Sequence, residues 1–275
     1  MTATRDRSFF NTPESIPLLL IEDLVNKNSS ILIVAPHPDD ETLGCGGAIA
    51  LLRQLNIVVK VLVVSDGTKS HPNSKTYPPP TLKKLREQES LAALAVLGVA
   101  PEAVTFLGMP DGAVPSVNLN SNEIVEIDKG IGRQGDKETK ERGQEYQDAI
   151  SLCHQYLKNT TPSIVLLPWR RDPHPDHRAS WQLFTAAIKN LINLPRLIEY
   201  PIWDWDTKQR QDFSESVDAW RLDISSVLEL KRQAIAQYRS QISDLIDDDP
   251  EGFRLTPEML LNFTQPWEIY LEVKL

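Results

Sequence analysis

Ile-Leu-Ile-Val-Ala at residues 31–35 is followed, after one proline, by His-Pro-Asp-Asp-Glu at 37–41. Ile-Val-Leu-Leu at 164–167 likewise precedes His-Pro-Asp-His at 174–177. We call the two polar segments the first and the second motif. Both apolar runs are short, rich in β-branched residues and not alternating, which favours strands buried on both faces. Ligands of open α/β sheets bind beyond the carboxyl ends of the strands, so the two motifs are expected to meet there.

The rest of the chain alternates between strand and helix patterns. We expect strands at 31–36, 57–64, 104–107, 163–167 and 196–200, and helices at 47–55, 81–97, 144–158, 176–191 and near 225–240. This order predicts an α/β fold that is Rossmann-like, with a mostly parallel sheet, helices on both faces and a metal site at the C-terminal ends of the strands.

The length of 275 residues suits one large α/β domain, and we expect a single domain over 1–275. Residues 108–143 contain several Gly and Pro and many charges, and they are too long for a plain connection. We therefore expect an insertion near 113–143. No internal repeat or linker is apparent.

Composition narrows the class of partner. The formal net charge is 29 − 38 = −9, which disfavours a nucleic-acid partner because phosphates require a basic face. Two cysteines make no disulfide framework and indicate a cytoplasmic protein. The apolar stretch at 16–20 is too short for a transmembrane segment.

The residue types of the two motifs indicate a metal. Zinc binds imidazole and carboxylate ligands, and a catalytic zinc site leaves one position for water. A lone histidine before proline is often a plain loop residue, but two such motifs at strand ends favour a metal site. His37, Asp40 and His177 would form such a ligand set, which could also accept iron or cobalt. Residue types do not decide between Asp39 and Asp40. Adjacent side chains in an extended segment point apart, so one could bind metal while the other faces substrate.

The segment 35–41, with Gly-Cys-Gly-Gly at 44–47, resembles the signature of the PIG-L/LmbE-type zinc-dependent de-N-acetylases, which are N-acetylglucosaminyl de-N-acetylase-like enzymes. The second motif resembles the second motif of that family. Weaker similarities are Ser-Asp-Gly at 65–67, Arg-x-x-Glu at 86–89 and Pro-Asp-Gly at 110–112. The resemblance covers roughly residues 30–205. The insertion and a divergent C-terminal part from about 206 fall outside the shared pattern.

The resemblance implies roles for individual residues. It makes His37, Asp40 and His177 the ligands of one zinc ion (Zn²⁺) per chain. It makes Asp39 the general base and His174 a protonated group beside the developing oxyanion. It further implies that two residues of the weaker similarities help to bind the substrate, namely Arg86 and Asp111.

The implied activity is zinc-dependent hydrolysis of an N-acetyl group from an N-acetylglucosamine-type sugar or glycoconjugate, a small-molecule amino-sugar substrate. One alternative is an amidase of another amino-sugar conjugate, such as a thiol conjugate. Another is a non-catalytic carbohydrate-binding protein of the same fold, against which the intact Asp39 and His174 argue. The sequence leaves a homo-oligomer open.

Several neighbouring features have structural interpretations. Glu41 is expected to orient the metal loop by hydrogen bonds. Cys45 is expected to be a packing thiol, and the glycines at 44–47 to allow a close helix start rather than nucleotide binding. The aromatic stretch 200–205 could pack in the core or form a sugar platform. Asp-Asp-Asp at 247–249 is expected to be a solvated turn.

Overall fold

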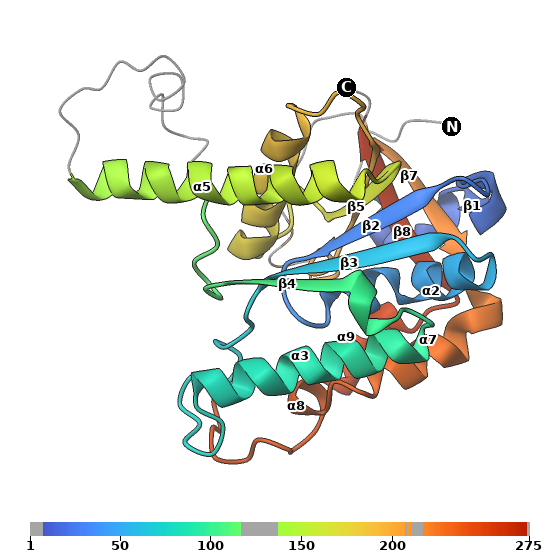
Figure 1. Ribbon diagram of the computed structural model, residues 1–275. Coiled ribbons are helices and arrows are strands. Elements are labelled where there is room, and N and C mark those ends of the chain that lie inside the picture. Colours follow the sequence, from blue (N-terminus) through green and yellow to red (C-terminus); the bar gives the residue numbers. More distant parts are fainter. Residues whose placement is uncertain (1–7, 117–136, 207, 209, 211–216, 274–275) are drawn as a thin grey trace.

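The computed structural model describes residues 8–116, 137–206, 208, 210 and 217–273. These residues form an eight-stranded sheet in the order β1-β7-β8-β6-β5-β2-β3-β4 (Figure 1). β8 is antiparallel to β6 and β7, and the other pairings are parallel. The mostly parallel sheet is thus confirmed. The strands are β1 (Leu18–Leu19), β2 (Ser30–Ala35), β3 (Val58–Ser65), β4 (Val104–Met109), β5 (Ile164–Pro168), β6 (Arg196–Tyr200), β7 (Val217–Asp223) and β8 (Trp267–Val273).

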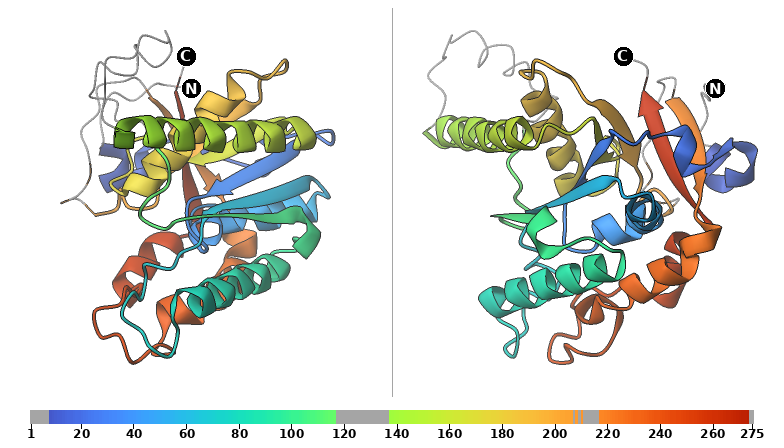
Figure 2. Two further views of the ribbon diagram at one scale, coloured as in Figure 1. Left: turned by 60° about the vertical axis from the view of Figure 1, so that its left-hand side comes forward. Right: turned by 45° about the vertical axis from the view of Figure 1, so that its right-hand side comes forward.

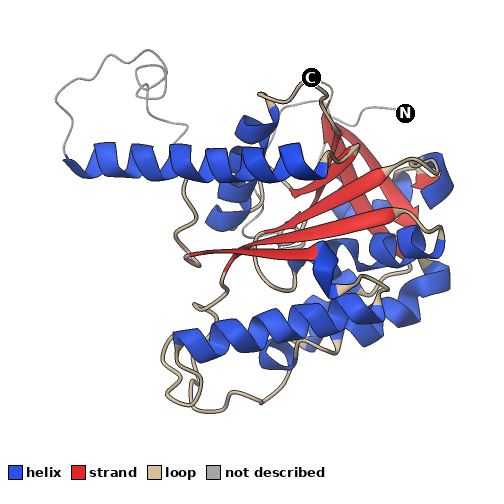
Figure 3. Ribbon diagram, viewed as in Figure 1, coloured by secondary structure: helices blue, strands red, loops and turns tan. Residues whose placement is uncertain are grey.

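Helices cover both faces of this sheet, as the alternating pattern predicted (Figure 3). α5 and α6 lie on one face, and α2, α3 and α7 lie on the other (Figures 1 and 2). The α-helices are α1 (Ser8–Asn11), α2 (Asp40–Gln54), α3 (Pro79–Val96), α5 (Lys137–Thr160), α6 (Pro175–Ile188), α7 (Leu228–Ile235), α8 (Arg239–Ile242) and α9 (Pro257–Phe263). None of the helices in the described part of the chain is both long and apolar enough to cross a bilayer.

The packing of β2 on both of its faces explains why its apolar run does not alternate with polar residues. Leu32 and Val34 pack into the core on the α5–α6 side, whereas Ile31 and Ile33 pack on the α2–α7 side. All four side chains are buried, because the strand has a helical layer over each face. β2 therefore lies in the middle of the molecule, and the first motif follows directly at its carboxyl end.

Two elements begin earlier than the sequence pattern indicated. α2 starts at Asp40 rather than at residue 47, so the first motif runs directly into a helix. The expectation that Asp39 and Asp40 lie in an extended segment is therefore wrong. α5 starts at Lys137, inside the expected insertion near 113–143. Residues 117–136 of that insertion lie outside the described residues.

The C-terminal part from about 206 belongs to the same sheet as the two motifs. β8 lies between β6 and β7, and α7 packs against α2 and α3. The helix expected near 225–240 is divided into a 3-10 turn at Ser225–Val227, α7 and α8. The sequence pattern did not indicate β1, β7 or β8.

Candidate metal and catalytic site

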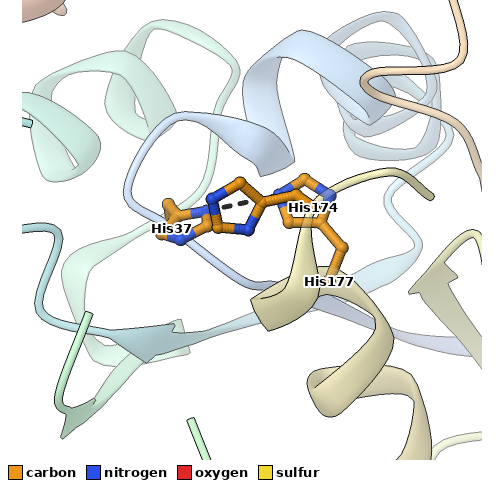
Figure 4. A group of neighbouring side chains, drawn as sticks. All are labelled: His37, His174 and His177. Atoms are coloured by element: carbon orange, nitrogen blue, oxygen red, sulfur yellow. Dashed lines mark hydrogen bonds between the residues drawn. The ribbon is translucent and has the colours of Figure 1, made fainter. Parts of the chain in front are cut away.

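Two neighbouring strands bring the motifs together. β2 leads into the first motif and α2, while β5, which pairs with β2, leads through a short loop into α6. His174 is the N-cap of α6 and His177 lies in its first turn. Figure 4 shows the rings of His37, His174 and His177 converging from these two loops. The meeting predicted from the strand ends is therefore observed.

Three donor atoms of the expected ligand set form a nearly equilateral triangle. Nδ1 of His37 lies 3.2 Å from Oδ2 of Asp40 and 3.3 Å from Nε2 of His177, and that Nε2 lies 3.2 Å from the same carboxylate oxygen. A tetrahedral zinc ion with bonds of about 2.0–2.2 Å separates its ligand atoms by roughly 3.3–3.6 Å. These residues thus fit a divalent metal ion almost without rearrangement.

Two other groupings of possible ligands overlap this triangle. His174 lies with His37 and His177, and Asp111 and Asp176 lie around the opposite nitrogen of His37. The carboxylates of Asp111 and Asp176 are 3.4 and 3.2 Å from Nε2 of His37. Since one histidine binds one metal through one nitrogen, these two carboxylates suit an orienting role when Nδ1 faces the metal.

Each histidine of the triangle has a carboxylate beside its second ring nitrogen. Asp172 lies 3.2 Å from Nδ1 of His177, and Asp176 also accepts the N–H of Gly112 at 2.6 Å. Burial opposes protonation of His177, but Asp172 and Asp40 raise its pKa to about 9 in the metal-free protein. Carboxylates in this position fix the tautomer and the ring orientation of metal-binding histidines. From the sequence alone, Asp172 could equally contact substrate or form a salt bridge beside the second motif, and Asp176 has no assigned role.

The two adjacent aspartates occupy different environments. Burial opposes ionisation of Asp40, but the charges and hydrogen bonds of His177 and His37 hold its pKa well below the ordinary range. Burial raises the pKa of Asp39 to about 7, and the charge of Arg86 only partly offsets this. A carboxyl group that titrates near neutrality beside a metal site is suited to proton transfer.

Asp39 has a strained backbone. Its φ is 143°, a value that residues with a side chain rarely adopt. The N–H of Asp39 donates to Oε2 of Glu41 at 3.1 Å. The expectation that Glu41 orients this loop by hydrogen bonds is therefore confirmed.

Arg86 lies buried beside Asp39. Its side chain is buried, and it donates to the carbonyl oxygens of Gly67 and Pro38 and, at 3.0 Å, to the carboxylate of Asp39. These contacts bind the guanidinium to the first motif, and a substrate contact for Arg86 stays a prediction. Asp111 accepts the N–H of Lys69 at 2.7 Å and lies beside His37, and a substrate contact for it stays a prediction.

His174 is not held in a protonated form. Its Nδ1 accepts the N–H of Asp176 at 3.2 Å, which leaves the proton of the neutral ring on Nε2. Burial and the nearby His177 and His37 lower the pKa of His174 to about 4. These contacts favour the neutral ring, and the protonated state that the resemblance implied for His174 stays a prediction.

The structural interpretations of the neighbouring features hold in part. The glycines at 44–47 lie inside α2, which begins at Asp40, so they do not mark the start of the helix as expected. A Cβ on Gly44 would lie 2.3 Å from the Tyr200 ring, so close packing requires this glycine. Cys45 is fully buried in the core. Trp205 packs edge-on against Phe10 and beside Trp267.

Two further expectations concern the aromatic stretch 200–205 and the three aspartates at 247–249. Trp203 packs edge-on against the partly exposed Phe253, and a sugar platform there stays a prediction. The solvated turn expected at 247–249 is wrong for the buried Asp249, whereas Asp247 and Asp248 are exposed. Asp248 accepts the N–H groups of Lys75 and Thr76, and the buried Asp249 accepts that of Asn73.

Comparison with known proteins identifies the family. Residues 32–188 match the PIG-L family, described as GlcNAc-PI de-N-acetylase, over more than half of the chain. This chain belongs to the PIG-L family. PIG-L proteins are deacetylase-type hydrolases and are generally metal-dependent, and membership makes this chain an enzyme of that type.

Comparisons with individual proteins extend the likeness beyond the matched segment. The diacetylchitobiose deacetylase of Thermococcus kodakarensis is 27% identical over 251 residues, which cover 86% of this chain and 81% of that protein. The conserved protein TT1542 of Thermus thermophilus superposes with a TM-score of 0.53 at 26% identity, over 78% of this chain and 80% of that one. The 4-carboxy-2-hydroxymuconate hydratase of Pseudomonas putida shares the fold, with a TM-score of 0.55 at 19% identity over 86% and 83% of the two chains.

Proposed function

We propose that this protein is a zinc-dependent hydrolase that removes the N-acetyl group from an N-acetylglucosamine-type sugar or glycoconjugate. The observation that carries the proposal is the triangle of donor atoms from His37, Asp40 and His177, with Asp39 next to it. The likeness to a diacetylchitobiose deacetylase supports the substrate class. The shared fold alone would not, because a hydratase has it too.

Different residues bind the metal, transfer the proton and position the base during amide hydrolysis. His37, Asp40 and His177 would hold the zinc ion, which would supply an acidified water and polarise the amide carbonyl. Asp39, ionised, accepts the proton of the attacking water and later returns it to the departing amine. Arg86 holds the carboxylate of Asp39 in place at 3.0 Å.

His174 lies beside His37 and His177, on the loop that follows β5. Its neutral ring carries a proton on Nε2 and can donate a hydrogen bond to the oxygen that becomes negative in the transition state. Such a donor does not need to be cationic. Loss of one donor of this kind costs about 3 kcal/mol of transition-state stabilisation in other enzymes.

Acetate release tests this proposal directly. The purified protein is incubated with diacetylchitobiose and, separately, with N-acetylglucosamine, before and after treatment with a chelator. We expect acetate from at least one probe, loss of release after chelation and recovery on adding zinc. Release that resists chelation would contradict the metal. Failure to release acetate, together with reversible binding of the sugars, would favour the carbohydrate-binding alternative.

A further inference from the structure

The first turn of α2 is held by residues far away in the chain. Glu41 accepts a hydrogen bond from the hydroxyl of Tyr238, which stands just before α8, and Thr42 lies 2.9 Å from the same hydroxyl. Tyr238, Glu41 and Thr42 are all buried. Tyr238 lies in the C-terminal part, outside the segment that matches the family, whereas Glu41 and Thr42 lie inside that segment.

The hydrogen bond continues from Tyr238 to the proposed general base. Tyr238 donates to Oε1 of Glu41, and Oε2 of the same carboxylate accepts the N–H of Asp39. A strained backbone such as that of Asp39 persists only where its surroundings hold it. Glu41 therefore has to keep its orientation, and the phenol of Tyr238 fixes the end of that carboxylate opposite Asp39.

Tyr238 itself is anchored on both sides. Seven residues earlier, Lys231 of α7 donates to the carbonyl oxygen of Leu43 in α2 at 2.8 Å. Two residues later, Ser240 donates its N–H and its hydroxyl to the carboxylate of Glu89 in α3. The contacts of α7 and α8 thus hold the Tyr238 side chain in place between them. Arg86 of α3 holds the carboxylate of Asp39 by a separate hydrogen bond.

We propose that Tyr238 is a positioning residue for Asp39, acting through Glu41. The phenol keeps the Glu41 carboxylate in the orientation that holds the strained Asp39, and so keeps the Asp39 carboxylate directed at the metal site. This inference rests on the proposed function, since it assumes that Asp39 is the base. Through Tyr238, the C-terminal part takes part in building the catalytic site.

Tyr238→Phe is the test, because it removes one hydroxyl and keeps the buried ring. Loss of an outer hydrogen-bond partner typically costs about 10–100-fold in activity or metal affinity. We expect kcat for acetate release from diacetylchitobiose to fall by about that factor. KM and the zinc dissociation constant, measured by competition with a chromogenic chelator, should stay within about threefold of wild type, because the metal ligands are untouched.

Tyr156→Phe is the matched control. The Tyr156 hydroxyl bonds to Thr105 at the far side of the sheet, so this variant loses a comparable interaction without touching α2. An unchanged kcat in Tyr238→Phe, an equal fall in Tyr156→Phe, or a parallel loss of zinc affinity in Tyr238→Phe would each overturn the positioning role. If wild type releases acetate and Asp39→Ala does not, the proposed function stands whatever Tyr238→Phe does.

Discussion

Asp39 and Asp40 show how two adjacent carboxylates acquire different functions. Both are buried, yet burial dominates at Asp39 and raises its pKa to about 7, while two histidines hold the pKa of Asp40 far lower. Groups whose pKa values are pushed apart are candidates for acid–base and ligand roles, respectively. The environment of each side chain, and not its type, therefore separates the proposed base from the proposed ligand.

Substitution of each aspartate should give distinct results. Asp39→Ala is expected to keep the metal and to lose roughly 10²–10⁴-fold in kcat, as when a general base is missing. Asp40→Ala is expected to lose metal, because one corner of the donor triangle is gone. Metal content and acetate release of the two purified variants check this. The opposite pattern would require the two roles to be exchanged.

Arg86 should set the acid limb of the pH profile. Its positive charge favours the ionised form of Asp39 and lowers that pKa, so removing the charge raises it. Asp39 must be ionised to act as a base, and the acid limb of kcat/KM in Arg86→Gln should therefore move to higher pH by about one pH unit or more. Arg86→Lys keeps the charge and should move the limb much less. The apparent pKa of this limb belongs to Asp39 together with the titrating groups that interact with it, and not to Asp39 alone.

Asp39 and Asp40, the proposed base and the proposed ligand, lie at the start of α2. A buried ion pair, Lys231–Glu268, contacts the second turn of the same helix. Lys231 binds the carbonyl oxygen of Leu43 and the carboxylate of Glu268, which in turn accepts the N–H groups of Gly47 and Ala48. A Cβ on Gly46 would lie 3.1 Å from the Lys231 stem. The glycines after the first motif thus admit a buried ion pair beside the helix.

Breaking this pair should destabilise the fold. Lys231→Met leaves Glu268 buried without its cation, which costs about 3–5 kcal/mol in comparable pairs. Lys231→Met combined with Glu268→Gln should recover much of this loss. The more exposed pair Arg196–Glu272 provides the control, and Glu272→Gln should cost about 1 kcal/mol or less. Urea unfolding of the metal-free proteins measures all three, and equal losses in the single and double variants would contradict the interpretation.

Across the whole molecule, the site joins two segments that are separated by about half of the chain. The first motif follows β2 and the second follows β5, and the donor triangle spans both. A metal ion held there would connect the two loops at the sheet end. It would therefore stabilise the folded chain by its binding free energy.

Zinc should accordingly raise the melting temperature. At a free concentration 100 times its dissociation constant, a ligand adds about 2.7 kcal/mol to the free energy of unfolding. For a chain of this size that corresponds to about 5–10 °C. His37→Ala and His177→Ala should abolish the increase, as thermal unfolding with and without zinc would show. A full increase in either variant would place the ion elsewhere.

The sequence by itself determined the features that depend on local pattern. Short apolar runs located β2, β3 and β5 to within one or two residues, because a strand buried on both faces needs a largely apolar run. Since parallel strands end at one edge of the sheet, the two motifs after β2 and β5 could be expected to meet.

Only the tertiary structure decided what surrounds the two motifs. Tyr238 and Lys231 contact α2 from nearly 200 residues away, and no spacing in the chain encodes such a contact. The sequence also could not show that Arg86 is buried against Asp39, or that a backbone N–H occupies Nδ1 of His174. The pKa of a buried group depends on the neighbours that folding brings to it, so the local pattern identified the reactive residues and the packing determined their states.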